Sequence, residues 1–385
     1  ADPLLFLFVG GFFIARAMSR HALDRRIALR LVTLPGVAGH PARVRLAFMG
    51  AAMLLSMWIS NTATCAILVP ILLGLRNPDA SDDGIGDSIL AVAYACSLGG
   101  LGTLVGSPPN SITVRFLREA GVQFSFVDWM KIGVPVAILL VGITFLVSLR
   151  DLPKRDVAQK PVARITSPWS RGERVTALAF GLAVVGWVVP AVMKSAGLEI
   201  GATLSAALPG GSVALLAASV LFVFRTPDGA RVLPWSDAAK IDWGIIMLFG
   251  GGITLGTQMI DTGLAERIAV AFVDGTGIES LIALTIFVTF FTIFFTEVCS
   301  NTASATMLVP LVIPIAARMG VAPLAPAMAV GLAASCAFML PVATGPNAVA
   351  YGTGLITTRQ MMRKGLVLNL LCGVAICVIV LVVFG

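Results

Sequence analysis

The chain has 385 residues, of which 57% are hydrophobic and 12% are Asp, Glu, Lys or Arg. A soluble domain carries roughly 25% charged residues, so this composition excludes an ordinary soluble protein and predicts an integral membrane protein. The formal net charge of +7 does not indicate a nucleic-acid partner, because the basic residues lie between apolar segments, where they orient membrane helices. The six Cys form no C-x-x-C pair and there are two His, which argues against a disulfide framework or a zinc site.

Several uncharged stretches are long enough to cross a bilayer, which takes about 20 apolar residues. The alternating pattern of an outer-membrane barrel is absent, so we predict an all-α polytopic membrane protein. The first apolar run covers residues 2–18 and contains a Gly-Gly pair, and a basic amphipathic stretch follows it. A similar run begins at Asp242 and contains three successive Gly. Because the chain begins with Ala1 beside an apolar run, and the second half has spans without a counterpart in the first, we expect that N-terminal spans are missing from it.

The segment over residues 46–75 contains no Asp, Glu, Lys, Arg or His, yet it carries Ser-Asn-Thr-Ala-Thr at residues 60–64. Each arm of about 15 residues spans only ~22 Å, which is short of the ~30 Å hydrocarbon core. We therefore predict a re-entrant helical hairpin with the polar cluster at its tip. The cluster recurs as Ser-Asn-Thr-Ala-Ser at residues 300–304, and we predict a matching hairpin over residues 281–317. This duplication favours a shared binding site over Ser and Thr that merely ease helix packing.

Two further apolar segments are each interrupted by Gly and Pro. Residues 88–118 contain Gly-Ser-Pro-Pro-Asn at 106–110, and residues 326–356 contain Ala-Thr-Gly-Pro-Asn at 343–347. An ordinary proline kink is the simpler alternative, but the duplication favours a discontinuous helix in each half.

These elements divide the chain into two repeats. The first repeat, residues 1–149, is partial and closes with a span at 132–149. A linker rich in Lys, Arg and Pro, residues 150–173, joins it to the second repeat, residues 174–385. The further spans that we predict in the second repeat cover residues 174–193, 203–224, 243–260 and 365–384.

The distribution of basic residues predicts the orientation in the plasma membrane (the cell inner membrane). If the linker 150–173 is cytoplasmic, most Lys and Arg residues lie on the inner side, as the positive-inside rule requires. The first hairpin then enters the membrane from the cytoplasm, the second enters from outside, and the C-terminus is external. This arrangement is an inverted-topology repeat, which is typical of secondary transporters.

The predicted membrane core has no Lys or Arg that could neutralise an anion. The four backbone breaks instead offer helix N-termini, which suit a carboxylate, and free carbonyl ends, which suit a small cation. Asn, Ser and Thr give oxygen atoms to a hard ion such as Na⁺ and donors to a carboxylate, so we predict that Na⁺ and an anion bind together. The main ionisable group of the core is Glu297, which we expect to be hydrogen-bonded within its hairpin rather than to couple protons.

Three features of the sequence are similar to those of one family: the paired Ser-Asn-Thr clusters, the two Gly/Pro breaks, and the run Ser-Cys-Ala-Phe-Met-Leu-Pro-Val-Ala at residues 335–343. Together they closely resemble the divalent anion:sodium symporter family, the INDY-type dicarboxylate transporters, from Asp2 onward. The resemblance implies an inverted repeat, a homodimeric scaffold and a transport domain that moves by an elevator mechanism. It implies no cofactor other than Na⁺ as coupling ion.

The resemblance also implies the site residues. One Na⁺ site would use Ser56, Ser60, Asn61 and the carbonyl of Gly106, and the other Thr296, Ser300, Asn301 and the carbonyl of Ala343. Substrate carboxylates would contact Asn61, Thr62, Ser107, Asn301, Thr302 and Thr344. The helical spacing agrees, because Ser56 and Ser60, like Thr296 and Ser300, are four residues apart and share a face. Family members often have Pro in place of Gly345 and Thr in place of Ser107, so we expect a roomier or more flexible pocket here.

We therefore predict Na⁺-coupled symport of C4-dicarboxylates such as succinate, malate or fumarate. Na⁺-independent dicarboxylate exchange, and Na⁺-coupled transport of citrate, tartrate or sulfate, are alternatives, because pocket shape rather than motif decides the substrate. A binding or sensor role is open as well, because N-terminal spans are expected to be missing. An intramembrane enzyme would need a nucleophile with a base, paired carboxylates or a metal cluster. His21 and His40 lie in the basic stretch, and Glu297 has no acidic neighbour in its hairpin, so an enzyme is disfavoured.

Overall fold

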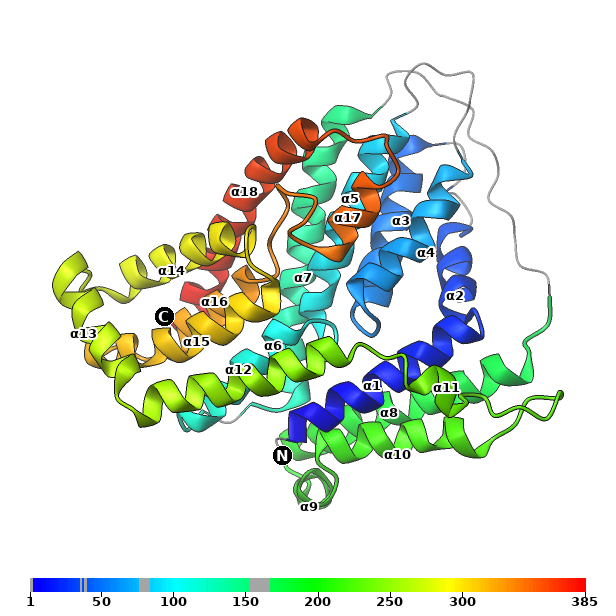
Figure 1. Cartoon of the computed structure of the whole chain (residues 1–385), viewed down its shortest axis with the longest axis horizontal. Helices are drawn as coiled ribbons and strands as arrows, with labels where there is room; N and C mark the ends of the chain where they lie inside the picture. Colours follow the sequence, from blue (N-terminus) through cyan, green and yellow to red (C-terminus); the bar gives the residue numbers. More distant parts are fainter. Residues whose placement is uncertain (1–2, 35–36, 38–39, 76–83, 123, 153–166) are drawn as a thin grey trace.

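The computed structural model describes residues 3–34, 37, 40–75, 84–122, 124–152 and 167–385 (Figure 1). In this part the chain forms helices and no extended strand. The helices before the linker are α1 Pro3–Arg20, α2 Leu23–Val32, α3 Pro41–Ser56, α4 Asn61–Leu73, α5 Ile85–Gly99, η1 Gly100–Gly102, α6 Pro108–Glu119, α7 Phe126–Ser148 and η2 Leu149–Asp151. Those after it are α8 Arg171–Ser195, α9 Glu199–Ala207, α10 Gly210–Val223, α11 Trp235–Ala238, α12 Trp243–Asp261, α13 Leu264–Thr276, α14 Leu281–Thr296, α15 Asn301–Arg318, α16 Leu324–Ala333, α17 Gly345–Tyr351 and α18 Thr358–Phe384.

Both predicted hairpin segments are interrupted beside their polar clusters. The α3 helix ends at Ser56 and α4 begins at Asn61, while α14 ends at Thr296 and α15 begins at Asn301. Both predicted discontinuous helices are interrupted as well, between α5 and α6 and between α16 and α17. Pro lies in the first turn of α6 and of α17, where its missing N–H costs no helical hydrogen bond.

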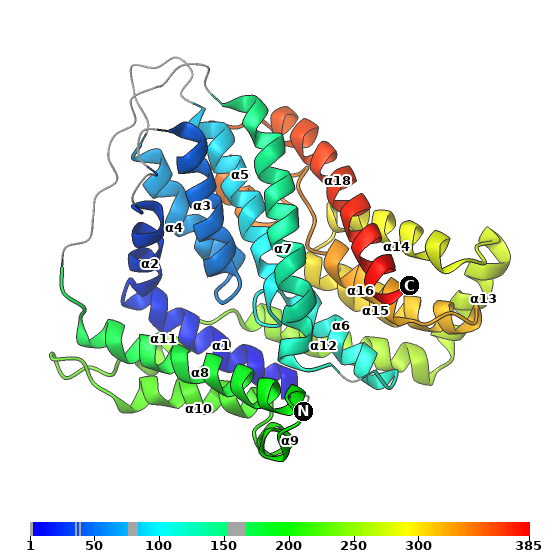
Figure 2. The same ribbon diagram turned by 180° about the vertical axis from the view of Figure 1, so that it is seen from behind.

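The two halves of the chain pack in corresponding ways. In the first half α5 packs against α3, α4 and α7, and in the second half α16 packs against α14, α15 and α18. The short helices after the breaks exchange partners, because α6 packs against α15 and α17 packs against α4. Figures 1 and 2 show the resulting arrangement, with α17 beside α4 and α5, and α6 beside α15 and α16. Each half therefore contributes one short helix to the other.

A third group of helices, α1, α8 and α10, lies along the lower edge of the molecule in Figure 1. Glycine allows α1 and α10 to touch backbone to backbone. A Cβ atom at Gly10 would lie 2.5 Å from the Ala214 carbonyl carbon, and one at Gly211 would lie 2.3 Å from the Pro3 carbonyl oxygen. Close backbone approach through small residues is the usual way to pack helices in lipid. The Phe8 and Phe249 rings, in edge-to-face contact at 5.3 Å, join this group to α12.

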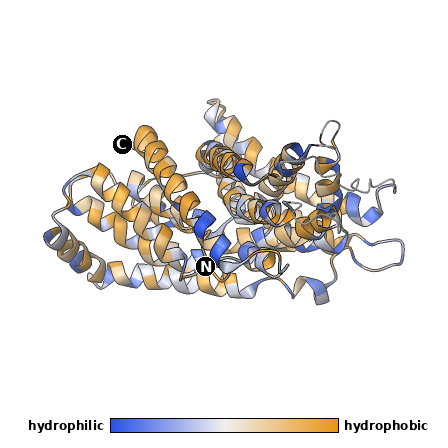
Figure 3. Ribbon diagram, turned by 90° about the horizontal axis from the view of Figure 1, so that it is seen from above, coloured by the Kyte–Doolittle hydropathy of each residue, from blue (hydrophilic) through white to orange (hydrophobic). Residues whose placement is uncertain are grey.

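Six helices of the described chain are long and apolar enough to cross a membrane, or up to eight if each bent pair of helices is one span. Hydrophobic residues extend along most of these helices (Figure 3). Many of their large apolar side chains are exposed, among them Phe287, Phe291 and Val382. Exposed apolar surface of this extent is what lipid-facing helices present. The prediction of an all-α, multi-pass membrane protein is confirmed.

The structure differs from the sequence prediction at residues 203–224. Residues 203–224, predicted as one span, fall on two helices, α9 and α10, which are bent by 71°. Pro209 explains this break, because it lacks an N–H group and disfavours a helical conformation at the residue before it. Most of the linker predicted at 150–173 lies outside the described residues.

Candidate sodium and substrate site

One cavity, of about 210 Å³, lies where the two polar tips meet the two helix breaks. Its lining comes from both halves of the chain and includes all of the predicted site residues except Ser56 and Thr296. Among the described residues that line it there is no Asp, Glu, Lys, Arg or His. The predicted residues that it brings together are Ser60, Asn61, Thr62, Gly106, Ser107, Ser300, Asn301, Thr302, Ala343 and Thr344.

The first tip is held by a hydrogen bond across its turn. Ser56, the last residue of α3, is buried and donates from Oγ to Asn61 Oδ1 over 2.7 Å. Gly100 approaches the same amide so closely that a Cβ atom there would lie 2.7 Å from Asn61 Oδ1 and 2.9 Å from the Gly106 carbonyl oxygen. The missing side chain at Gly100 thus allows two predicted Na⁺ ligands, Asn61 Oδ1 and the Gly106 carbonyl, to lie close together.

The second tip has a similar arrangement with Thr in place of Ser. Thr296 Oγ1 lies 2.9 Å from Asn301 Oδ1 and 3.0 Å from the Ala334 carbonyl oxygen. Ser300 caps α15, because its Oγ accepts a hydrogen bond from the Ala303 N–H group over 3.1 Å. Hydroxyl, amide and carbonyl oxygens therefore gather at each tip. This donor set fits Na⁺ and excludes a soft metal.

A buried Asn bridges each helix break. Asn110 Nδ2 donates to the carbonyls of Gly100 and Thr103, ten and seven residues earlier, over 2.8 and 2.7 Å. Asn347 Nδ2 donates to carbonyls at the same two spacings, over 3.0 Å each. These bonds hold the non-helical stretches that supply the Gly106 and Ala343 carbonyls. Because the spacings are the same, residues 100–110 of the first half are equivalent to residues 337–347 of the second half.

The region around Gly345 corrects the expectation of a roomier pocket. A Cβ atom at Gly345 would lie 1.9 Å from Thr62 Oγ1, so the Thr62 side chain of α4 already fills the space. Ser107 is also engaged, because its Oγ lies 3.1 Å from Ser335 Oγ in the turn after α16. At Gly345 the contact with Thr62 leaves no extra space, and at Ser107 the hydroxyl joins the two halves.

The partners of Glu297 also differ from the expectation. Its buried carboxylate accepts hydrogen bonds from the N–H groups of residues 338–340, over 2.7, 2.9 and 3.1 Å, and from Asn369 Nδ2 over 2.8 Å. The prediction of bonding within the hairpin is wrong, because these donors belong to the break after α16 and to α18. At the corresponding position of the first tip stands Met57, whose side chain packs against Gly102. The carboxylate thus ties the second tip to its break and has no equivalent at the first tip.

The electrostatics of the cavity follow from helix ends. The helices α4, α6, α15 and α17 all begin at residues that line it or lie next to it, so their N-termini converge there. In α4 the N-cap Ser60 makes no side-chain bond to the helix, which leaves backbone N–H groups of its first turn free for an anion. The cavity can therefore hold an anion at the helix starts and small cations at the carbonyl and amide oxygens, without a basic residue in its described lining.

Sequence reasoning missed several cavity residues. The α1 helix contributes Phe8, Phe12 and Ala15, and α12 contributes Ile245. Such apolar lining residues carry no motif, and their place in the wall depends on how distant helices pack. Trp58, beside the first tip, is a further apolar residue of the lining. Its ring stacks on the rings of Phe126 and Trp187.

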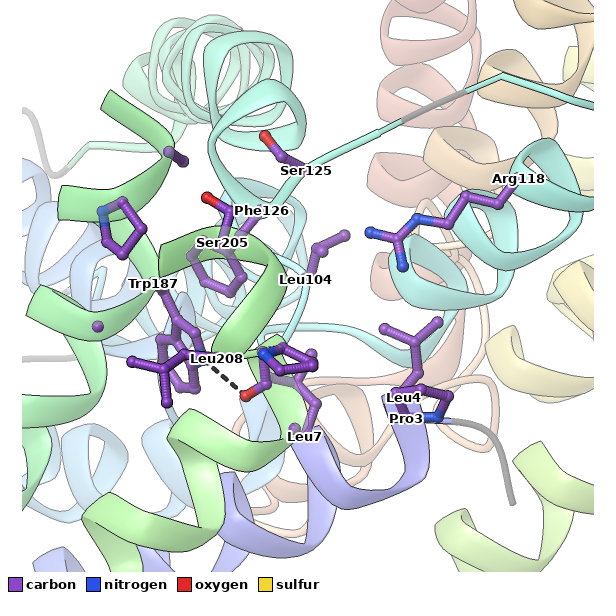
Figure 4. Close-up of a pocket in the computed structure, with 16 residues that line it drawn as sticks. Pro3, Leu4, Leu7, Leu104, Arg118, Ser125, Phe126, Trp187, Ser205 and Leu208 are labelled. Carbon is purple, nitrogen blue, oxygen red and sulfur yellow. Dashed lines mark hydrogen bonds between the residues drawn. The ribbon is translucent and has the colours of Figure 1, made fainter. Parts of the chain in front are cut away.

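A second cavity, of about 280 Å³, lies where α1, α8, α9 and α10 meet α6 and the start of α7 (Figure 4). Its described lining is mainly apolar and contains no residue of either polar tip. Arg118 reaches it, but the Arg118 guanidinium also donates to the Phe124 carbonyl over 3.0 Å. Trp187 on the opposite side donates from its indole N–H to the Gly210 carbonyl over 3.0 Å. The paired polar motifs therefore place the candidate site in the smaller cavity.

Comparison with known proteins identifies the family. Residues 1–385 match the family described as the sodium:sulfate symporter transmembrane region. The chain belongs to this family, the divalent anion:sodium symporters. Members of this family are transporters, which confirms the prediction of a transporter rather than an enzyme.

Curated relatives and a solved structure agree with this assignment. The chain is 33% identical over 402 residues to the sodium-dependent dicarboxylate transporter SdcS of Staphylococcus aureus strain USA300, covering 98% of this chain and 76% of the relative. It is 34% identical, with the same coverage, to SdcS of the bovine strain RF122 / ET3-1. The crystal structure of the YdaH transporter of Alcanivorax borkumensis has a similar fold, with a TM-score of 0.67 and 16% identity over 98% of this chain and 84% of that one.

Proposed function

We propose that this protein is a secondary transporter that couples the inward movement of Na⁺ to the uptake of C4-dicarboxylates such as succinate, malate or fumarate. The observation that carries the proposal is a cavity lined by both Ser-Asn-Thr tips and both helix breaks. The relatives described as sodium-dependent dicarboxylate transporters support the same substrate class.

The residues have separate roles in this proposal. In the first half Na⁺ binds to Ser56, Ser60, Asn61 and the Gly106 carbonyl, and in the second to Thr296, Ser300, Asn301 and the Ala343 carbonyl. The two carboxylates of the substrate contact Asn61, Thr62, Ser107, Asn301, Thr302 and Thr344. The amide groups of Asn61 and Asn301 take part in both tasks, because each presents an oxygen to the cation and an NH₂ group to the anion.

The binding of Na⁺ and of the dicarboxylate is coupled through their opposite charges. A dicarboxylate carries two negative charges, and the described lining offers no basic side chain to balance them. Bound Na⁺ supplies that balance, and the converging helix N-termini add partial positive charge. Neither ligand binds well alone, so the affinity for the anion depends on the Na⁺ concentration.

The proposal includes the arrangement in the membrane. The two halves form an inverted repeat with two re-entrant hairpins, the linker lies in the cytoplasm, and the C-terminus lies outside the plasma membrane. The hairpins and broken helices move together as a transport domain in an elevator mechanism, against a homodimeric scaffold that includes α1, α8 and α10. The close backbone packing of α1 on α10 supports a rigid role for that group.

Uptake of radiolabelled succinate into proteoliposomes tests the proposed function. We expect uptake to be faster with an inward Na⁺ gradient than with an equal K⁺ gradient, and to be inhibited by malate and fumarate. Equal rates with the two cations would contradict symport, and counter-flow that needs only internal dicarboxylate would identify an exchanger. Inhibition by citrate or sulfate but not by C4-dicarboxylates would assign a different anion.

A further inference from the structure

Ser97 has no role in the proposed function, yet it lies in the wall of the cavity. It stands on α5, its residue exposure is 1%, and its Oγ has no hydrogen-bond partner within the described residues. A helical Ser or Thr usually donates to the carbonyl four residues earlier, as Thr144 does to Leu140 over 2.8 Å. A buried hydroxyl without a partner is unfavourable unless a bound ligand provides one.

The position of Ser97 on its helix shows which ligand is near. Gly100 is the first residue of η1 and follows α5 directly with a helical backbone conformation. Because residues three apart share a face of a helix, Ser97 of α5 and Gly100 lie on the same side. Gly100 is the residue that approaches Asn61 Oδ1 and the Gly106 carbonyl oxygen, at 2.7 and 2.9 Å from a Cβ atom built on it. Ser97 is therefore about one turn away from Gly100, the residue that contacts the proposed Na⁺ ligands, and it lines the same cavity as Asn61 and Gly106.

The chemistry of this position favours a cation over the dicarboxylate. Ser97 Oγ is almost inaccessible to water, which leaves less room beside it for a bulky anion than for a small cation. We propose that Ser97 Oγ is a further Na⁺ ligand of the first half. This inference rests on the proposed function, because it deepens the ion site assigned there.

The equivalence of the two helix breaks indicates that the two proposed ion sites differ. The spacing of the Asn110 and Asn347 hydrogen bonds aligns Ser97 with Ala334, whose methyl group offers no ligand. The second half has the buried Glu297 carboxylate beside its tip instead, where the first half has Met57. The first site thus depends on an added neutral oxygen, and the second is strengthened by a nearby negative charge.

Thermal unfolding of the full chain in detergent tests this inference. NaCl is replaced stepwise by KCl at constant ionic strength, and the Na⁺ concentration that gives half of the stabilisation is measured. We expect Ser97→Ala to raise this concentration about threefold to tenfold, as the loss of one good oxygen contact should. Ser97→Cys keeps the size of the side chain but replaces a hard ligand by a soft one, so it should have the same effect without a packing defect.

Ser111→Ala is the matched control, because Ser111 is also a buried hydroxyl beside a break but donates to the Leu104 carbonyl over 2.8 Å. It should lower the unfolding temperature and leave the Na⁺ dependence unchanged. A normal Na⁺ response in Ser97→Ala and Ser97→Cys, or an equal shift in Ser111→Ala, would overturn the inference. A wild-type protein that Na⁺ does not stabilise would overturn both the inference and the proposed function. If the Ser97 variants shift as expected but succinate uptake ignores the Na⁺ gradient, the proposed function alone fails.

Discussion

Among single residues, two Asn side chains have a double role in the proposed function, as ligands of both cation and anion. Asn61 and Asn301 each accept a hydrogen bond from a hydroxyl of the preceding arm, over 2.7 and 2.9 Å, which fixes the amide oxygen toward that arm. Both residues also line the cavity. In the proposed function the amide oxygen binds the ion and the NH₂ group binds the carboxylate, so one residue serves both ligands.

The first prediction concerns these amides. Asn61→Ala and Asn301→Ala should each weaken Na⁺ and dicarboxylate binding together, by about tenfold or more, because hydrogen bonds to charged groups contribute about 1.5–3 kcal/mol. Na⁺- and succinate-dependent thermal stabilisation would measure both effects, with Ser219→Ala on the exposed side of α10 as a control. Full Na⁺-dependent stabilisation in both variants would contradict the assignment of these ligands.

The second prediction concerns the contact between Gly345 and Thr62. Gly345→Ala should displace the Thr62 side chain or the start of α17, since the added methyl group would lie 1.9 Å from Thr62 Oγ1. We expect a lower affinity for the dicarboxylate and a loss of stability of about 1–3 kcal/mol. Gly142→Ala, on α7, is the matched control, because a Cβ atom there meets nothing within 4 Å. Unchanged succinate affinity in Gly345→Ala would show that this contact does not shape the site.

At the scale of elements, each half pairs a hairpin with a broken helix, and one carboxylate joins such a pair in the second half. Glu297 stands at the end of α14, and its four hydrogen bonds reach the turn after α16 and the middle of α18. Three successive backbone N–H groups around one carboxylate stabilise its charge without a basic partner. The geometry therefore favours a structural role over proton coupling.

The third prediction follows from this arrangement. Glu297→Gln should lower the stability by about 2 kcal/mol, because charged hydrogen bonds are roughly twice as strong as neutral ones. The pH dependence of uptake should stay that of the wild type, and Glu266→Gln, an exposed residue on α13, should change neither property. If a well-folded Glu297→Gln variant lost the pH dependence of uptake, Glu297 would carry protons instead.

The element breaks could be predicted from the sequence, because each is marked by a polar cluster or by Gly and Pro within an uncharged stretch. The helices are interrupted beside each tip, at residues 57–60 and 297–300, and at each Gly/Pro break, at residues 103–107 and 334–344. Contacts between distant segments could not be predicted in this way. The partners of Glu297 lie 41 to 72 residues away in the chain, and the counterpart of a Glu in one half is a Met in the other.

The same limit applies to the residues around the cavity. The motifs contained Asn110 and Asn347, but nothing in them distinguished a bridge across the break from a ligand. Ser97 has no motif of its own, and its lack of a partner is visible only once α5 is placed beside the first tip. The bend between α9 and α10 was marked by Pro209, but a continuous apolar pattern concealed it.

At the scale of the whole molecule, the charge distribution predicts how the protein lies in the membrane. The fourth prediction is that the C-terminus faces outward, because the linker 150–173 carries many of the basic residues that should stay inside. Alkaline phosphatase fused after Gly385 should be active in intact bacteria, whereas a green fluorescent protein at the same place should stay dark. The same reporters inserted in the linker should behave in the opposite way. Reversed results would invert the proposed orientation.

The proposed mechanism requires that the two tips hold Na⁺ and a dicarboxylate in the cavity between them. An experimental density map of the protein in lipid nanodiscs, with saturating NaCl and succinate, tests it most directly. We expect an elongated density in contact with Asn61, Thr62, Asn301 and Thr302, which disappears when K⁺ replaces Na⁺. A succinate density in the cavity of Figure 4, or one between the tips that persists without Na⁺, would contradict it.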